Sequence, residues 1–110
     1  MRCTNTYLIN TYAEFNRKYF HNRLPKDMVV RFEFLERKGE ETALGATEFY
    51  YGRPLFICIH DRIQWNHMLV DVTLLHEMVH VEHPNWEGHG YQFQKRMLQL
   101  AKHGAFKGCW

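Results

Sequence analysis

The chain has 110 residues, a length that suits one domain with one modest hydrophobic core. Its composition is 45% hydrophobic, 15% aromatic and 24% charged with only three prolines, which excludes a disordered or low-complexity chain. The formal net charge of +2 is too small to indicate a nucleic-acid partner by itself.

The apolar segments and the cysteines exclude two further classes of protein. No apolar run approaches the roughly 18 residues of a membrane-spanning helix, and the first residues lack the apolar block of a signal peptide. Cys3, Cys58 and Cys109 lie far apart and form no Cys-x-x-Cys pair, which argues against a disulfide framework or a Cys-ligated zinc finger. We therefore expect a cytoplasmic, monomeric protein without a membrane partner.

Hydrophobic periodicity predicts a helix at the start of the chain, over about residues 5–20. Its apolar positions recur at steps of four, three and four: Leu8, Tyr12, Phe15 and Tyr19. This spacing places them on one face of a helix. Leu24-Pro25 ends the segment.

Three strands are predicted in the middle of the chain. Residues 30–34 alternate apolar and charged side chains, as in a half-buried strand, and residues 37–41 form a charged turn after it. Residues 44–51 are a second strand, and Gly52-Arg53-Pro54 turns the chain into a third over residues 55–60. Cys58 lies within this last apolar run, so we expect it to be a small buried side chain.

Two helices are predicted to follow the strands. Residues 66–81 carry Leu69, Val72, Leu75 and Val79 at helical spacing, and Pro84 ends that helix. Residues 84–90 form a turn-rich connection, and Phe93 to Ala101 belong to a last helix that ends before Gly104. The fold class is therefore α+β, in a single domain over residues 1–110: helix, three strands, helix, helix.

Charge is unevenly distributed along the second half of the chain. No Lys or Arg occurs between Ile63 and Gln94. The acidic residues of that stretch are Asp71, Glu77, Glu82 and Glu87, and the basic residues that follow it are Lys95, Arg96, Lys102 and Lys107. No acid occurs after Glu87. This distribution favours a cation near the acidic stretch and a polyanion near the basic end.

An H-E-x-x-H motif, His76-Glu77-Met78-Val79-His80, lies inside the first of these two helices. Histidines four residues apart are separated by about 6 Å along a helix axis and about 40° in rotation, so both imidazoles can reach one metal ion. Glu77 can approach a metal-activated water without binding the metal, and can take its proton. The motif thus predicts two zinc ligands, His76 and His80, and a general base, Glu77.

A catalytic zinc site usually has a third protein ligand. His83 is poorly placed if the helix continues to it, since it would lie about 10 Å beyond His76 along the axis. His89 is flanked by Gly88 and Gly90 after the proline break, where the chain can fold back on the helix. Glu87 is the alternative ligand in the same segment.

At this point the chain resembles the SprT-like zinc metalloproteases, the family of bacterial SprT and eukaryotic Spartan. The matching segments are His76 to His80, Gly88-His89-Gly90-Tyr91-Gln92-Phe93, Tyr12 to Phe20 with Asn22-Arg23-Leu24-Pro25, Gly45-Ala46-Thr47, Pro54 to Ile59 and Leu74-Leu75. They cover roughly residues 12–100. The gap from His80 to His89 is short for the family, and the sequence ends without the cysteine-rich zinc ribbon that often follows its catalytic domain.

The resemblance implies a minimal zincin-like fold in which one Zn²⁺ is bound by His76, His80 and His89, with Glu77 as the catalytic base. It also implies proteolysis of DNA-associated or DNA-crosslinked proteins. We expect a protein or peptide substrate that adds as a strand to a sheet edge beside the metal-binding helix, although the sequence does not identify the strand. The competing hypothesis is a non-catalytic zinc-stabilised module that binds DNA or a protein through a closed, four-ligand site.

The basic end of the chain is the candidate DNA contact. Lys95, Arg96, Lys102 and Lys107 could bind phosphates, with Trp110 available to stack on an unpaired base, which favours single-stranded DNA. A solvated helix face is the simpler interpretation of the same residues.

Overall fold

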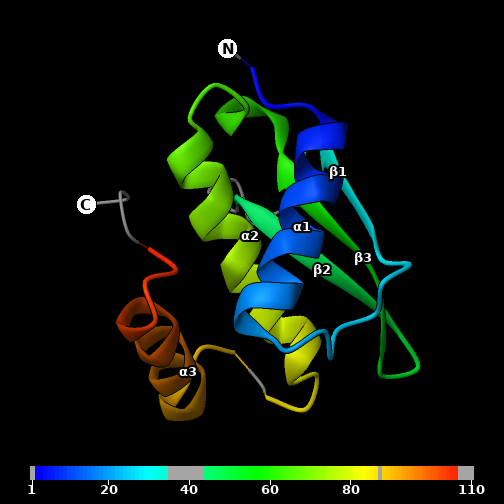
Figure 1. Ribbon diagram of the computed structural model, residues 1–110. Helices are drawn as coiled ribbons and strands as arrows, with labels where there is room; N and C mark the ends of the chain where they lie inside the picture. The colour runs from blue at the N-terminus through cyan, green and yellow to red at the C-terminus, as the bar shows by residue number, and fades with distance from the viewer. Residues whose placement is uncertain (1, 35–43, 87, 107–110) are drawn as a thin grey trace.

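Three α-helices and three strands make up the described part of the computed structural model, which covers residues 2–34, 44–86 and 88–106 (Figure 1). In chain order they are α1 (Asn5–Tyr19), β1 (Val29–Glu33), β2 (Gly45–Tyr50), β3 (Arg53–His60), a 3₁₀ turn (Asp61–Ile63), α2 (His67–Glu82) and α3 (Tyr91–Lys102). The α+β class and the predicted order of elements are confirmed. The charged turn expected at residues 37–41 lies outside the described residues.

The sheet is mixed, with β3 in its centre. The strand order is β1-β3-β2, in which β1 runs parallel and β2 antiparallel to β3. Val30 and Thr47 both pair with Ile57, so these three side chains point to the same face of the sheet. Helices α1 and α2 cover that face, α1 over β1 and α2 over β2 and β3 (Figure 1). The strand β2 is thus an edge strand that lies beside α2.

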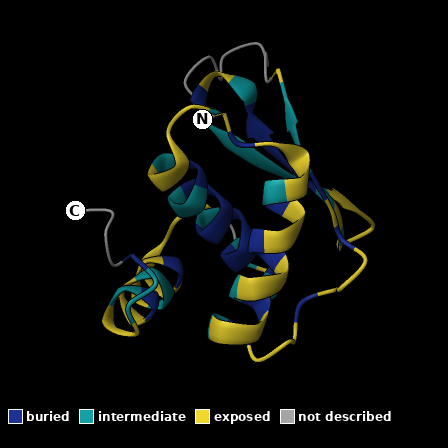
Figure 2. Ribbon diagram, turned by 45° about the horizontal axis from the view of Figure 1, so that its top comes forward, coloured by how far each residue is buried: buried dark blue, intermediate teal, exposed yellow. Residues whose placement is uncertain are grey.

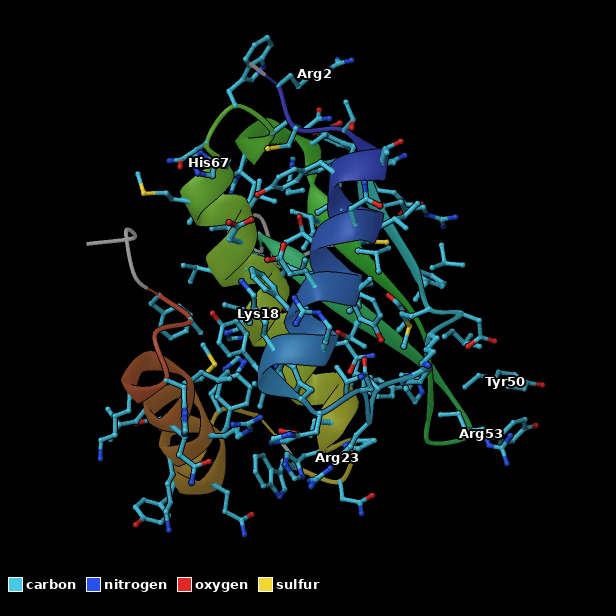
Figure 3. The ribbon with its side chains drawn as sticks, in the orientation of Figure 1. Arg2, Lys18, Arg23, Tyr50, Arg53 and His67 are labelled. Carbon is cyan, nitrogen blue, oxygen red and sulfur yellow. The ribbon has the colours of Figure 1, made fainter. Side chains whose placement is uncertain are left out.

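The turn between β2 and β3 is shorter than predicted. Tyr51 and Gly52 form it with positive φ angles of 50° and 77°, which matches the two-residue turns that suit a hairpin. Arg53 and Pro54, expected in the turn, belong to β3 instead. Pro54 is tolerated there because it lies near the start of the strand and opposite the bulge at Glu48/Phe49. Arg53 and Tyr50 project from this hairpin away from the helices (Figure 3).

Side-chain hydrogen bonds fix both ends of α1. The Thr4 hydroxyl accepts from the backbone N–H of Tyr7 at 3.2 Å and caps the first turn. At the other end the buried Asn16 amide binds the backbone of Leu24 twice, donating to its carbonyl and accepting from its N–H. The helix ends at Tyr19, within one residue of the predicted end, and the chain turns at His21 and Asn22, whose φ angles are 54° and 59°.

Helix α2 forms the centre of the core. Leu74, Leu75, Met78 and Val79 are completely buried, so the helix is covered on more sides than the single predicted apolar face. Figure 2 shows α2 largely buried behind α1, whose outer face is exposed. Cys58 on β3 is also buried, as predicted. Among the described residues, no helix is long and apolar enough to cross a membrane.

Candidate metal centre

Three histidines from two segments converge on one point. His76 and His80 lie one turn apart on α2, and His89 comes from the connection between α2 and α3. The Nε2 atom of His89 is 2.9 Å from Nε2 of His76 and 3.1 Å from Nε2 of His80. The three donor atoms lie within 4.8 Å of one another, so these residues, called here the histidine cluster, can hold one metal ion.

Three imidazole nitrogens are a suitable donor set for a tetrahedral metal ion, and two of their three separations are close to those of such a site, the third being at most 4.8 Å. Zinc–nitrogen bonds of 2.0–2.1 Å imply about 3.3 Å between two nitrogens of a tetrahedral site, within a few tenths of an ångström of the distances to His89. Burial, followed by the nearby His89 and His80 charges, lowers the pKa of His76 to about 4. Burial and then His89 also lower the pKa of His80. Both imidazoles are therefore neutral at neutral pH, the form that binds metals.

The loop that carries His89 is held in place by backbone features. Gly88 has a φ of 63°, a left-handed conformation that suits glycine and reverses the chain after α2. The His89 carbonyl accepts a hydrogen bond of 3.0 Å from the side-chain amide of Gln94 in the first turn of α3. The ring of Phe93 packs behind the histidine cluster, with centroid distances of 4.7 to 4.8 Å to the three imidazoles.

The Glu77 carboxylate lies beside the histidine cluster but outside it. Its Oε2 is 3.9 Å from Nε2 of His76, while its Oε1 accepts a hydrogen bond of 2.9 Å from the Thr47 hydroxyl on β2. Only 5% of Glu77 is exposed, and this burial raises the pKa of its carboxyl to about 7 against the opposing effect of the Thr47 hydrogen bond. A buried acid with one oxygen engaged and the other near the metal position has the arrangement of a general base.

Gly45 allows β2 to approach α2 closely at this point. A Cβ atom at Gly45 would lie 2.8 Å from Cγ2 of Thr73 and 3.2 Å from Oε2 of Glu77. Any larger residue would therefore push the strand or the carboxylate aside. No local pattern predicts the contact of Gly45 and Thr47 with Glu77, because Glu77 is 30 residues away from Thr47 in the chain.

An open cleft of about 400 Å³ gives access to these groups. Its walls are β2, α2 and the loop before α3, and its lining residues are Gly45, Ala46, Thr47, Phe49, His76, Glu77, His80, Trp86, Gly88 and His89. We call it the site cleft. It brings the edge strand, the histidine cluster and Glu77 onto one surface.

The other candidate ligands do not join the histidine cluster. His83 stacks on Trp86 at 3.7 Å between ring centroids and its Nε2 is 3.1 Å from a Glu82 oxygen. Glu87 lies outside the described residues. Among residues 2–34, 44–86 and 88–106, no fourth His, Cys, Asp or Glu completes the cluster, so there it has three donors.

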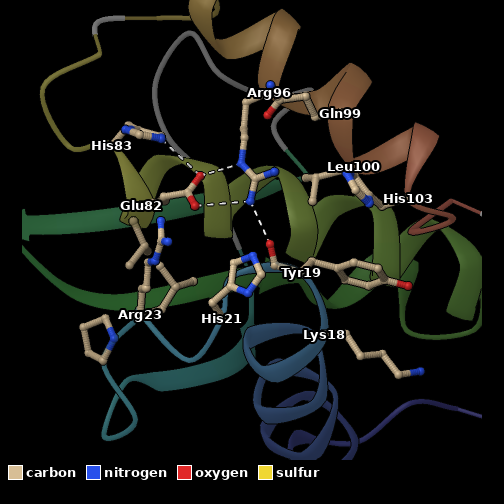
Figure 4. A pocket seen from close by; sticks show the side chains of 13 residues that line it. Lys18, Tyr19, His21, Arg23, Glu82, His83, Arg96, Gln99, Leu100 and His103 are labelled. Carbon is tan, nitrogen blue, oxygen red and sulfur yellow. Dashed lines mark hydrogen bonds and ion pairs between the residues drawn. The ribbon is translucent and has the colours of Figure 1, made fainter.

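The predicted DNA-contacting residues differ in their surroundings. Lys95 and Lys102 on α3 are exposed, and Lys107 lies outside the described residues. The Arg96 guanidinium is mostly buried, donating to both oxygens of Glu82 at 2.7 and 3.2 Å and to the Tyr19 carbonyl at 2.8 Å (Figure 4). Arg96 therefore ties α3 to α2 and α1, a role that the sequence analysis missed.

Comparison with known proteins adds no relative to this description. No family model matches the chain, and searches of curated proteins and of solved structures gave no match. The fold and the site therefore define the class of protein by themselves: an α+β domain with a candidate three-histidine metal centre beside a buried glutamate.

Proposed function

We propose that the protein is a zinc-dependent metalloendopeptidase. One observation carries the proposal: three convergent imidazoles lie beside a buried glutamate whose carboxylate is held by a hydroxyl from the edge strand. A zinc site that only stabilises a fold does not need such a base, which favours an enzyme over the non-catalytic binding module.

The residues of the site have separate roles in peptide hydrolysis. His76, His80 and His89 would hold the ion, and three protein donors leave a position open as in catalytic zinc sites. When bound, zinc supplies Lewis-acid polarisation of the peptide carbonyl and makes water more acidic. Glu77 accepts the proton of the attacking water and delivers it to the leaving amine. Thr47 binds Oε1 of Glu77 and leaves Oε2, the oxygen nearer His76, to exchange that proton.

The edge strand β2 supports the binding of an extended peptide. In the described part of the sheet β2 pairs only with β3 and is an edge strand, the kind of strand to which an extended peptide can add. Because Thr47 contacts Glu77, a peptide paired with β2 would pass directly over the base. The resemblance adds DNA-associated proteins as the substrate class, and the exposed Lys95 and Lys102 are the described residues that could contact DNA phosphates.

The proposal is tested by zinc content and proteolysis measured on the same preparations. Wild type, Glu77→Gln and His80→Ala are analysed by mass spectrometry for zinc and incubated with a DNA-binding protein, with and without single-stranded DNA. We expect about one zinc per chain in wild type and Glu77→Gln, none in His80→Ala, and cleavage by wild type alone. Zinc without cleavage under any condition would favour the binding module. Absence of zinc in wild type would refute the metal site.

A further inference from the structure

The lining of the site cleft includes two large apolar side chains that the catalytic proposal does not use. Phe49 and Trp86 are the large apolar side chains in its lining; the other lining residues are glycine, alanine, threonine and the residues of the metal centre. Phe49 is 40% exposed on the edge strand, where its ring lines the cleft. Such an uncovered apolar surface inside a cleft indicates contact with a ligand.

The position of Phe49 relative to Glu77 sets what the Phe49 ring can contact. Phe49 lies two residues after Thr47 along β2, a rise of about 7 Å in a strand. The pairing of β2 with β3 shifts by one residue between Glu48 and Phe49, and Phe49 lines the same cleft as Thr47. A peptide paired with β2 would therefore bring a side chain against Phe49 within about two residues of the bond beside Glu77.

Trp86 lines the same cleft from the loop before α3, and its ring has a stacking partner. Its ring stacks on His83 with centroids 3.7 Å apart and planes at 11°, and its backbone N–H donates to the His83 carbonyl at 3.1 Å. Trp86 also lines a second hollow of about 470 Å³, together with Asn85, Gly90, Tyr91, Gln92 and Phe93. Trp86 thus lines both hollows, and its stacked ring offers an apolar surface to a side chain, as expected of a subsite.

We infer that Phe49 and Trp86 form an apolar subsite that selects substrates with a bulky aliphatic or aromatic side chain within two residues of the scissile bond. The inference rests on the proposed function, because it assigns the substrate preference of the same cleft. Outside the metal centre, no described residue that lines the cleft carries a charge. A carboxylate placed against these apolar side chains would lose water without gaining a partner, so acidic side chains are disfavoured.

The test measures peptide binding and cleavage separately. Zinc-loaded Glu77→Gln is titrated, by fluorescence anisotropy, with peptides that carry Phe, Leu, Gln, Asp or Lys at each of the two positions on either side of a fixed central bond. At one of these positions we expect Phe and Leu to bind at least tenfold more tightly than Gln and Asp. Phe49→Ala and Trp86→Ala, introduced into Glu77→Gln, should remove this preference, whereas Phe49→Leu, which stays apolar, should keep most of it.

Tyr51→Ala is the matched control. Tyr51 is 88% exposed at the tip of the hairpin and does not line the site cleft, so its loss should leave the preference unchanged. The inference would be overturned if all peptides bound equally or if Lys were preferred through cation–π contact. It would also be overturned if Tyr51→Ala lost the preference to the same extent. Cleavage by wild type without side-chain preference would overturn it and leave the protease intact. Apolar-selective binding without cleavage by wild type would support the subsite and refute the protease.

Discussion

The close approach of β2 to α2 at Gly45 predicts that a larger residue at this position will disturb the fold and the site. In Gly45→Ala the new Cβ would lie 2.8 Å from Cγ2 of Thr73, and ordinary contact begins at 3.4 Å, so something must move by about 0.6 Å. Thr73 is a buried, β-branched residue within α2 and cannot rotate away easily. The strain is therefore expected to move β2 or the neighbouring Glu77 side chain.

This displacement should lower both the stability of the fold and the rate of cleavage. Overpacking of this kind costs about 1–3 kcal/mol in the free energy of unfolding, which corresponds to a fall in Tm of roughly 4 °C or more for a domain of this size. Because the proposed reaction needs Glu77 correctly placed to transfer a proton, we expect the cleavage rate of zinc-loaded Gly45→Ala to fall by about tenfold or more. Thermal unfolding followed by circular dichroism and a peptide cleavage assay give the two values.

A second substitution shows whether the contact with Thr73 is the cause. Thr73→Ser deletes the Cγ2 atom and should cost about 1 kcal/mol alone, but the double variant should be less destabilised than the sum of the single variants. Gly90→Ala is the control, because a Cβ at Gly90 meets no atom within 4 Å. If Gly45→Ala is as stable as Gly90→Ala, or if the two substitutions are additive, the packing argument is wrong.

Three further predictions concern the residues around the metal centre. Thr47→Val removes the hydroxyl that holds Glu77 and should slow cleavage by about tenfold or more, whereas Thr47→Ser should keep most of the activity; equal rates would refute the role of the hydroxyl. His89→Ala should lose zinc by mass spectrometry while His83→Ala retains it, and the reverse would identify His83 as the ligand. Arg96→Gln should destabilise the fold by about 2 kcal/mol in urea unfolding, against less than about 0.5 kcal/mol for the exposed Lys95→Gln.

The elements of the fold could be predicted because each depends on a local pattern. The predicted helix over residues 5–20 is α1 (Asn5–Tyr19) within one residue, since its apolar spacing acts locally. The strand order β1-β3-β2 was not predicted. Alternation determines which side chains share a face of a strand, but it does not determine which strand pairs with which.

The same distinction explains which parts of the site could be predicted. His76 and His80 are brought together by helix geometry alone, so their spacing was sufficient. His89 required the chain to fold back, and the sequence offered Glu87 and His83 as alternatives. The Thr47–Glu77 hydrogen bond depends on how the sheet docks on α2. The packing of Phe93 behind the imidazoles depends on how α3 docks on α2. No local sequence pattern determines either docking.

The docking of α3 links the metal centre to a contact outside the site cleft. Phe93 and Arg96 are three residues apart on α3, so they face α2 together, one against the histidine cluster and the other against Glu82. The Gln94 amide on the same helix holds the His89 carbonyl. A substitution that loosens the docking of α3 should therefore weaken metal binding. Because the coupling is reciprocal, a bound metal should stabilise the docked position of α3 by the same coupling free energy. Arg96→Gln should accordingly lower the affinity for zinc although Arg96 is not a ligand, and an affinity equal to that of Lys95→Gln would show that the ligands are held without α3.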